Sequence, residues 1–359
     1  MSNRYHLLLL ALLSLLLAAC NSVTYYGQAI SGQMQLLILR QPISKLIEEP
    51  ATSSTLRQRL QSVANMRAFA SRELALPDNP SYTSYVDLKR PYVIWNVFAA
   101  PEFSLAPKQW CYPIAGCVSY RGYFSEVRAR TYAAKLHRKG FDTEVAGISA
   151  YSTLGWFSDP LLNTMLSRSE TQLAGTLFHE LAHQQLYAKN DTRFNESFAV
   201  TVEMEGVRRW LQDQGKVNQF RDYLQSLKRK RQFIALVQGA HAKLEKLYVQ
   251  DRSETEKRTA KAAIFQQLKT DYRQLKKGWN NYRGYDAWFN RKLTNASLVP
   301  ISSYYDYVPA FQALLRRSRN NLAAFYRAAR RIAEQTPADR KATLMQLSTD
   351  QDPDTPERG

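Results

Sequence analysis

Two histidines four residues apart, His179 and His183, are the residues of this chain best suited to chemistry. On a helix, residues at this spacing lie on one face about one turn apart, so both imidazoles can reach the same metal ion. Glu180 follows the first histidine and would lie beside that ion, where its carboxylate can take a proton from a bound water. The pattern therefore predicts a metal site with a general base.

The residues before the histidines predict the helix that must carry them. Leu173, Leu177 and Leu181 recur at every fourth position, as on the apolar stripe of a helix. Ser169 and Gln172 have the spacing of a capping box, which indicates that the helix begins there. His-Glu-x-x-His on such a helix is the pattern of zinc hydrolases.

A zinc ion that activates water needs a third protein ligand and one open position. No histidine follows at the spacing of His-Glu-x-x-His-x-x-Gly-x-x-His, so we expect a carboxylate from the next helix. Glu196 lies on a segment, 191–211, that reads helical after an N-cap at Asp191. Glu203 lies seven residues on, on the same face, where it could orient a ligating histidine. Glu203 also remains the alternative ligand, because one helical face does not choose between the two.

The surrounding elements predict a predominantly helical α+β fold with a small sheet. Residues 92–98 and 118–124 are rich in β-branched and aromatic side chains and are expected to be strands. A helix over 125–139 should cross the sheet, and further strands are expected at 143–146 and 150–156. The zinc helix and the helix of the third ligand would follow.

The chain divides into five expected parts, whose boundaries follow changes in composition and periodicity. They are a signal peptide at 1–19, a helical segment at 20–90, a zincin-type catalytic core at 91–215, a helical region at 216–345 and a disordered tail at 346–359. The helical segment at 20–90 is expected to pack on the core without chemistry of its own. The C-terminal region should hold a helical hairpin over 219–279 and a last helix that ends near Glu334.

The first twenty residues predict export and lipid attachment. Arg4 precedes an apolar run at 7–17 that is too short for a stable membrane span and fits a signal peptide. Cys20 directly follows Leu-Ala-Ala, the pattern at which bacterial lipoproteins are cleaved and lipidated; a secretory signal with a chance cysteine is the alternative. Because Asn21 and not an aspartate comes next, we expect an outer-membrane anchor with the protein facing the periplasm.

The other two cysteines, Cys111 and Cys117, enclose five residues that include Pro113 and Gly116. In an oxidising periplasm such a pair is expected to close a small loop with a disulfide. The pair lacks Cys-x-x-Cys spacing and histidine neighbours, which argues against a second metal site.

The chain is strongly basic, with a formal net charge of +18 over 359 residues, of which the predicted signal peptide removes only about one charge, that of Arg4. Nucleic acid is the general inference from such a charge, but none is expected in the periplasm. An anionic membrane surface, lipopolysaccharide or an acidic peptide is the more accessible partner. The basic run at 228–231 is expected to be a solvated helix face.

Several stretches outside the histidine motif add a resemblance that covers most of the chain. They are residues 26–33, 116–124, 152–160, 178–183, 195–199 and 308–311. Together they resemble a family of bacterial lipoproteins identified as predicted zinc aminopeptidases. Asn-Glu-x-x-Ala after His-Glu-Leu-Ala-His is similar to the gluzincin metallopeptidases, although the twelve residues between His183 and Glu196 are fewer than in the best-known members.

The resemblance implies a peptide substrate and one Zn²⁺ per chain, bound by His179, His183 and Glu196. Zinc lowers the pKa of its water to about 7 and polarises the scissile carbonyl. Glu180 would accept the proton of that water and pass it to the leaving amine.

Related folds take a donor for the oxyanion from later in the chain, which indicates Tyr304 and Tyr305 here. An extended substrate could also pair with residues 151–156, by analogy. Residues that would clamp a free amino end are not recognisable. A zinc endopeptidase of the envelope and a non-catalytic lipoprotein therefore stand as alternatives to an aminopeptidase.

Overall fold

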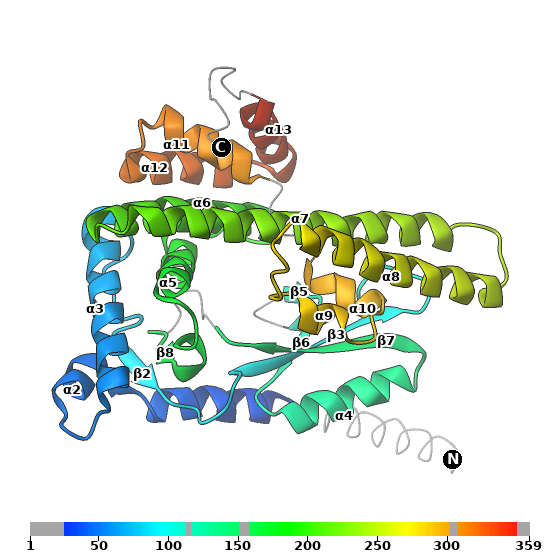
Figure 1. The fold of residues 1–359 in the computed structure, drawn as a ribbon, viewed down its shortest axis with the longest axis horizontal. Coiled ribbons are helices and arrows are strands. Elements are labelled where there is room, and N and C mark those ends of the chain that lie inside the picture. Colours follow the sequence, from blue (N-terminus) through cyan, green and yellow to red (C-terminus); the bar gives the residue numbers. More distant parts are fainter. Residues whose placement is uncertain (1–24, 113–115, 151–157, 302–306, 350–359) are drawn as a thin grey trace, which may run out of the picture.

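The computed structural model describes residues 25–112, 116–150, 158–301 and 307–349. Long helices surround small sheets (Figure 1). The predicted α+β fold, predominantly helical, is confirmed, because helices make up most of the described chain and its sheets have only two or three strands.

The helices are residues 25–38, α2 (Ile43–Glu48), α3 (Ser54–Leu74), α4 (Glu126–His137), α5 (Glu170–Gln185), α6 (Thr192–Asp213), α7 (Val217–Tyr248), α8 (Glu254–Lys277), α9 (Asp286–Phe289), α10 (Asn295–Leu298), α11 (Val308–Arg317), α12 (Leu322–Ala333) and α13 (Pro337–Thr349). The strands are β1 (Gln41–Pro42), β2 (Ser84–Val86), β3 (Ile94–Pro101), β4 (Trp110–Tyr112), β5 (Gly116–Val118), β6 (Arg121–Tyr123), β7 (Phe141–Ile148) and β8 (Leu161–Leu162).

β3 is the central strand of the main sheet and pairs antiparallel with β6 and β7. Ser125 caps α4, whose buried face packs on this sheet as predicted. The strands expected at 92–98 and 143–146 are therefore present as β3 and β7, and the one expected at 118–124 is divided between the last residue of β5 and β6. The strand expected at 150–156 falls almost wholly outside the described residues.

A second small sheet has the order β1-β2-β8, with β2 parallel to β8. The sequence did not indicate it within the segment 20–90, which was expected to be helical. Its strands are two or three residues long, too short for a periodic pattern. They are defined by pairing between distant segments, such as Tyr85 with Leu161.

The main core lies around α5 and α6, which run against each other and against α3. Phe178 of α5 is fully buried there, next to Phe69 of α3. Gly206 of α6 lets the helices approach, since a Cβ at that position would lie 2.7 Å from Phe178 Cδ2 and 2.9 Å from Leu74 Cδ1. This close contact holds the two helices that carry the predicted ligands.

The helical hairpin predicted over 219–279 is present as α7 and α8, with its own apolar cluster. The prediction of a single last helix that ends near Glu334 is wrong. This segment forms two helices, α11 and α12, because Arg319 and Asn320 between them adopt left-handed backbone angles of φ 54° and 57°. The predicted disordered tail is also wrong at 346–349, which belong to α13. Buried Leu344 and Leu347 fix that helix to the core.

The two cysteines of the β4–β5 hairpin, Cys111 and Cys117, stand at paired positions and are joined by a disulfide. Cys20 lies outside the described residues, so its lipidation stays a prediction. Of the helices in the described ranges, none is both long and apolar enough to cross a membrane.

Candidate metal centre

The first half of the site is built on α5. Ser169 and Gln172 form the predicted capping box, which fixes where the helix begins. His179 and His183 then lie one turn apart, with ring centroids separated by 4.8 Å and ring planes nearly perpendicular. Their Nε2 atoms face each other at 3.2 Å.

The second half of the site depends on the short loop between α5 and α6. Asp191 caps α6 by accepting a hydrogen bond from the backbone N–H of Phe194. Asn195 holds the loop from both sides: its Oδ1 accepts from the N–H of Ala188 at 2.7 Å, and its Nδ2 donates to the carbonyl of Ala188 at 2.8 Å. These two hydrogen bonds of Asn195 hold a tight turn between the helices. A gap of only twelve residues therefore brings Glu196 back to the histidines.

Glu196 approaches both histidines with its two oxygens. Oε2 lies 3.3 Å from Nε2 of His179, and Oε1 lies 3.6 Å from Nε2 of His183. The three donor groups all lie within 4.8 Å of one another. Ligand atoms that hold tetrahedral zinc at about 2.0–2.2 Å lie roughly 3.3–3.5 Å apart, so these residues fit the ion.

Glu203 occupies a different position. Its Oε2 lies 3.1 Å from Nδ1 of His179, the ring nitrogen that faces away from Glu196. Its Oε1 accepts a hydrogen bond from the hydroxyl of Tyr223 at 2.9 Å. A carboxylate on the far nitrogen of a histidine fixes the ring and leaves the other nitrogen to a metal. The arrangement favours Glu196 over Glu203 as the third ligand.

The carboxylates of the site favour a positive charge beside them. Burial lowers the pKa of His179, but hydrogen bonds to Glu196 and Glu203 outweigh it and raise that pKa to about 10. Burial, reinforced by the neighbouring His179, lowers the pKa of His183 to about 4. Buried carboxylates of this kind need a compensating cation, which a proton supplies in a metal-free site and a divalent ion would supply better.

One atom of the site is not satisfied by the described residues. Nδ1 of His183 is buried without a hydrogen-bond partner there. If Nε2 binds a metal, Nδ1 carries the proton, and an unmatched buried N–H costs about 1–3 kcal/mol. Metal coordination must exceed that cost.

Glu180 extends from α5 beside these groups and is partly exposed. Burial raises the pKa of its carboxyl, His179 lowers it, and the charges of Glu196 and Asp159 raise it again. The net effect is a pKa above the ordinary value. A carboxylate so tuned is a better proton acceptor, as a general base requires.

The comparison with protein families indicates a class of substrate, which the geometry alone does not. A model of the family described as "Putative aminopeptidase" matches residues 24–344. The chain belongs to this family. No curated protein and no solved structure matches it. Membership of the aminopeptidase family supports a peptidase that acts on peptide substrates.

The two tyrosines predicted as oxyanion donors, Tyr304 and Tyr305, lie outside the described residues. The described chain resumes at Tyr307, whose backbone N–H donates to Ser197 Oγ at 3.2 Å. Ser197 follows Glu196 on α6, so Tyr307, two residues after Tyr305, contacts the helix that carries the predicted third ligand.

Sequence reasoning missed two other tyrosines near the centre, Tyr120 and Tyr187. The ring of Tyr187 lies 6.4 Å from that of His183, and both phenols are partly exposed. Burial raises the pKa of each, and the charge of Glu196 raises it further. Tyr187 could have been found, since it lies only four residues after His183, although α5 ends at Gln185; Tyr120 lies within the family-like stretch 116–124.

A polar cavity of about 270 Å³ borders Glu203 on the side away from the predicted ligands. Arg168 of the segment before α5 and Lys230 of α7 line it together with several tyrosines. The charge of Lys230 lowers the pKa of both Glu203 and Glu196. Lys228, Lys230 and Arg231 of the basic run are exposed, as predicted for a solvated helix face, and the charge of Lys230 also acts on these two carboxyls.

Proposed function

We propose that this chain is a zinc-dependent peptidase and, within its family, an aminopeptidase. The observation that carries the proposal is the convergence of His179 Nε2, His183 Nε2 and Glu196 on one point, with Glu203 behind His179. Three protein ligands and an open position are the arrangement of catalytic zinc. The family match over residues 24–344 supports peptide bonds as the target.

His179, His183 and Glu196 would hold the zinc ion, which when bound makes water more acidic and polarises the scissile carbonyl. Glu180 takes the proton of the attacking water and delivers it to the leaving amine, so that no free amide anion is expelled. Its raised pKa suits both tasks, because a stronger base accepts more readily and the resulting acid still donates. Glu203 and Tyr223 keep the His179 ring in place.

The oxyanion that develops on the scissile carbonyl needs a hydrogen-bond donor from the protein. Tyr187 is the described residue best placed for this role. Its ring lies beside that of His183, and the charge of Glu196 raises the pKa of its hydroxyl. Its raised pKa keeps the phenol protonated and able to donate. Tyr120, Tyr304 and Tyr305 are the alternatives.

Recognition of a free amino end requires an accessible acceptor for the ammonium group. Asp159 acts on Glu180 by its charge but is only 2% exposed, so it is not available to a substrate. Glu180 is partly exposed, as Glu196 and Glu203 are, but unlike them it is not assigned to the metal or to the ring of His179. A zinc endopeptidase of the envelope is the second candidate, because the sequence shows no recognisable clamp for a free amino end.

A panel of aminoacyl fluorogenic substrates, assayed beside N-blocked peptides of the same sequence, tests the proposal. An aminopeptidase cleaves only the free series, and an endopeptidase cleaves the blocked peptides. The Glu180→Gln variant serves as the control for contaminating activity. A zinc-loaded, folded wild type that cleaves neither series would favour the non-catalytic alternative.

We also propose that Cys20 carries a lipid that anchors the chain to the outer membrane, facing the periplasm. The apolar run at 7–17 and the Leu-Ala-Ala-Cys box support this. Labelling of expressed protein with a radioactive fatty acid, compared with a Cys20→Ala variant, tests it; equal labelling of the two would contradict it.

A further inference from the structure

The helix at 25–38 exposes an apolar stripe. Tyr26, Ile30, Met34 and Ile38 recur at every fourth position and are between 41% and 73% exposed. Residues at this spacing share one helical face. A continuous apolar face that remains open to solvent generally marks an interaction site.

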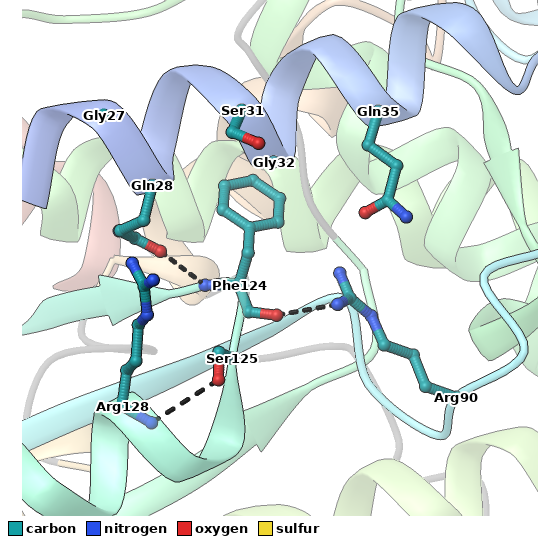
Figure 2. Close-up of a pocket in the computed structure, with 9 residues that line it drawn as sticks. All are labelled: Gly27, Gln28, Ser31, Gly32, Gln35, Arg90, Phe124, Ser125 and Arg128. Carbon is teal, nitrogen blue, oxygen red and sulfur yellow. Dashed lines mark hydrogen bonds between the residues drawn. The ribbon is translucent and has the colours of Figure 1, made fainter.

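The rest of the molecule fixes the stripe outward. Gln28 on the opposite side accepts a hydrogen bond from the N–H of Phe124 (Figure 2). It also donates to the carbonyl of Gly122. The ring of Phe124 fills the space that a Cβ at Gly32 would need. Arg90 donates to the carbonyl of Phe124 at 2.7 Å. These contacts attach the side of the helix opposite the stripe to the rest of the fold, so the stripe faces outward.

Beside the start of this helix lies a basic groove of about 820 Å³, between residues 25–28, β6 and α4. Its cations are Lys108, Arg121, Arg128, Lys135, Arg138 and Lys139. Of the described residues that line it, none carries a carboxylate. The acid of α4, Glu126, is paired with Arg130 outside the groove.

The groove also holds aromatic rings that orient its cations. The guanidinium of Arg121 lies 4.0 Å from the ring centre of Tyr25 and 4.8 Å from that of Tyr132. Such stacking fixes a cation without neutralising it. The helix at 25–38 and α4 lie along the same edge of the molecule, opposite α11–α13 (Figure 1).

We propose that the apolar stripe of the helix at 25–38 and the exposed cations in and directly after α4, which lies along the same edge of the molecule, form one docking face for the surface of an anionic phospholipid bilayer. The apolar stripe enters the boundary between headgroups and acyl chains, and these cations contact lipid phosphates. An apolar helical face flanked by lysine and arginine is the composition that such interfacial helices have.

The path of the chain supports this occupant. Cys20, the predicted lipidation site, is five residues before Tyr25, and five extended residues span at most about 18 Å. A lipid on Cys20 would therefore hold the face within a short distance of the bilayer, where the attraction of its cations is effective. A second copy fits less well, because a symmetric dimer through this face would place two cationic grooves together.

Vesicle co-sedimentation tests the proposal on the chain from residue 20 onward with Cys20→Ser, which keeps every described residue but carries no lipid. It should bind vesicles of phosphatidylcholine and phosphatidylglycerol and not vesicles of phosphatidylcholine alone. Lys135→Gln, Arg138→Gln and Lys139→Gln together should weaken binding by roughly 100-fold, at about fivefold per cation. Ile30→Ser with Ile38→Ser should weaken it by roughly tenfold per residue.

Matched controls separate this face from general charge and hydrophobicity. Arg327, Arg331 and Lys341, changed together to Gln, remove three exposed cations at the opposite edge; Val217→Ser with Val249→Ser removes exposed apolar groups from α7 and the residue after it. Both controls should bind as the parent does. Equal losses in test and control variants, equal binding to neutral vesicles, or a dimer in light scattering that Ile30→Ser with Ile38→Ser dissolves would overturn the proposal.

Discussion

The candidate metal centre and the proposed docking face are opposites in burial and in charge. At the metal centre His179, Glu196 and Glu203 are largely buried, and each holds another in place. At the docking face the cations of α4 and the stripe of the helix at 25–38 point outward. The properties of the first region depend on contacts between its own buried side chains. Those of the second depend on side chains that remain exposed to solvent. The two should therefore respond to substitution independently.

The largest effect should follow from Glu180→Gln. The variant keeps the size of the side chain but cannot accept the proton, so kcat should fall by about 10²- to 10⁴-fold while zinc stays bound. Steady-state kinetics and metal content measure both quantities. Vesicle binding should not change, and a folded variant that loses its zinc would make Glu180 a ligand and not the base.

Tyr187→Phe should have the next largest effect, because it removes a single hydroxyl donor. We expect a loss of about 10²- to 10³-fold in kcat with little change in KM, as for other donors to an oxyanion. The same change at Tyr120, Tyr304 and Tyr305 completes the series. If one of those three lowers kcat and Tyr187→Phe does not, the role passes to that residue.

Zinc binding should release a proton. At neutral pH the His179 of a metal-free site is protonated, since its pKa is raised to about 10, and a coordinating imidazole must be neutral. Zinc affinity should therefore rise with pH, by up to about tenfold per unit below that value. Calorimetry in buffers of different ionisation enthalpy measures the proton, and a pH-independent affinity would contradict the charge assigned to the site.

The smallest expected effect concerns stability. Gly206→Ala forces a methyl group against Phe178 and Leu74, and such overpacking costs about 1–3 kcal/mol of unfolding free energy. Ile30→Ser lies on the exposed stripe and should change it by less than about 0.5 kcal/mol. Urea denaturation of both variants measures the contrast. A greater loss from Ile30→Ser would mean that the stripe is part of the core.

The parts that sequence could predict were those in which the evidence is local. The capping box at Ser169 and the cap at Asp191 give the starts of α5 and α6, and the motif residues of both helices lie within one short segment. The strands β1, β2 and β8 could not be predicted, because each is defined only by a distant partner.

The same limit applies to function. Tyr120 and Lys230 belong to other elements, and no spacing in the sequence relates either residue to the histidine motif. The helix at 25–38 was expected to pack like any amphipathic helix, and only the structure shows that one apolar side faces outward. Periodicity identifies a helical face but does not say what covers it.

The most direct test of the account is the zinc content of four proteins after reconstitution and dialysis against a weak chelator. The wild type should retain about one zinc per chain, and Glu196→Ala and His183→Ala should retain almost none. Glu203→Ala should bind zinc roughly 10- to 100-fold more weakly but still detectably, because its carboxylate only orients His179. Zinc kept by Glu196→Ala and lost by Glu203→Ala would reverse the assignment, and a folded wild type that holds no zinc would contradict the metal centre itself.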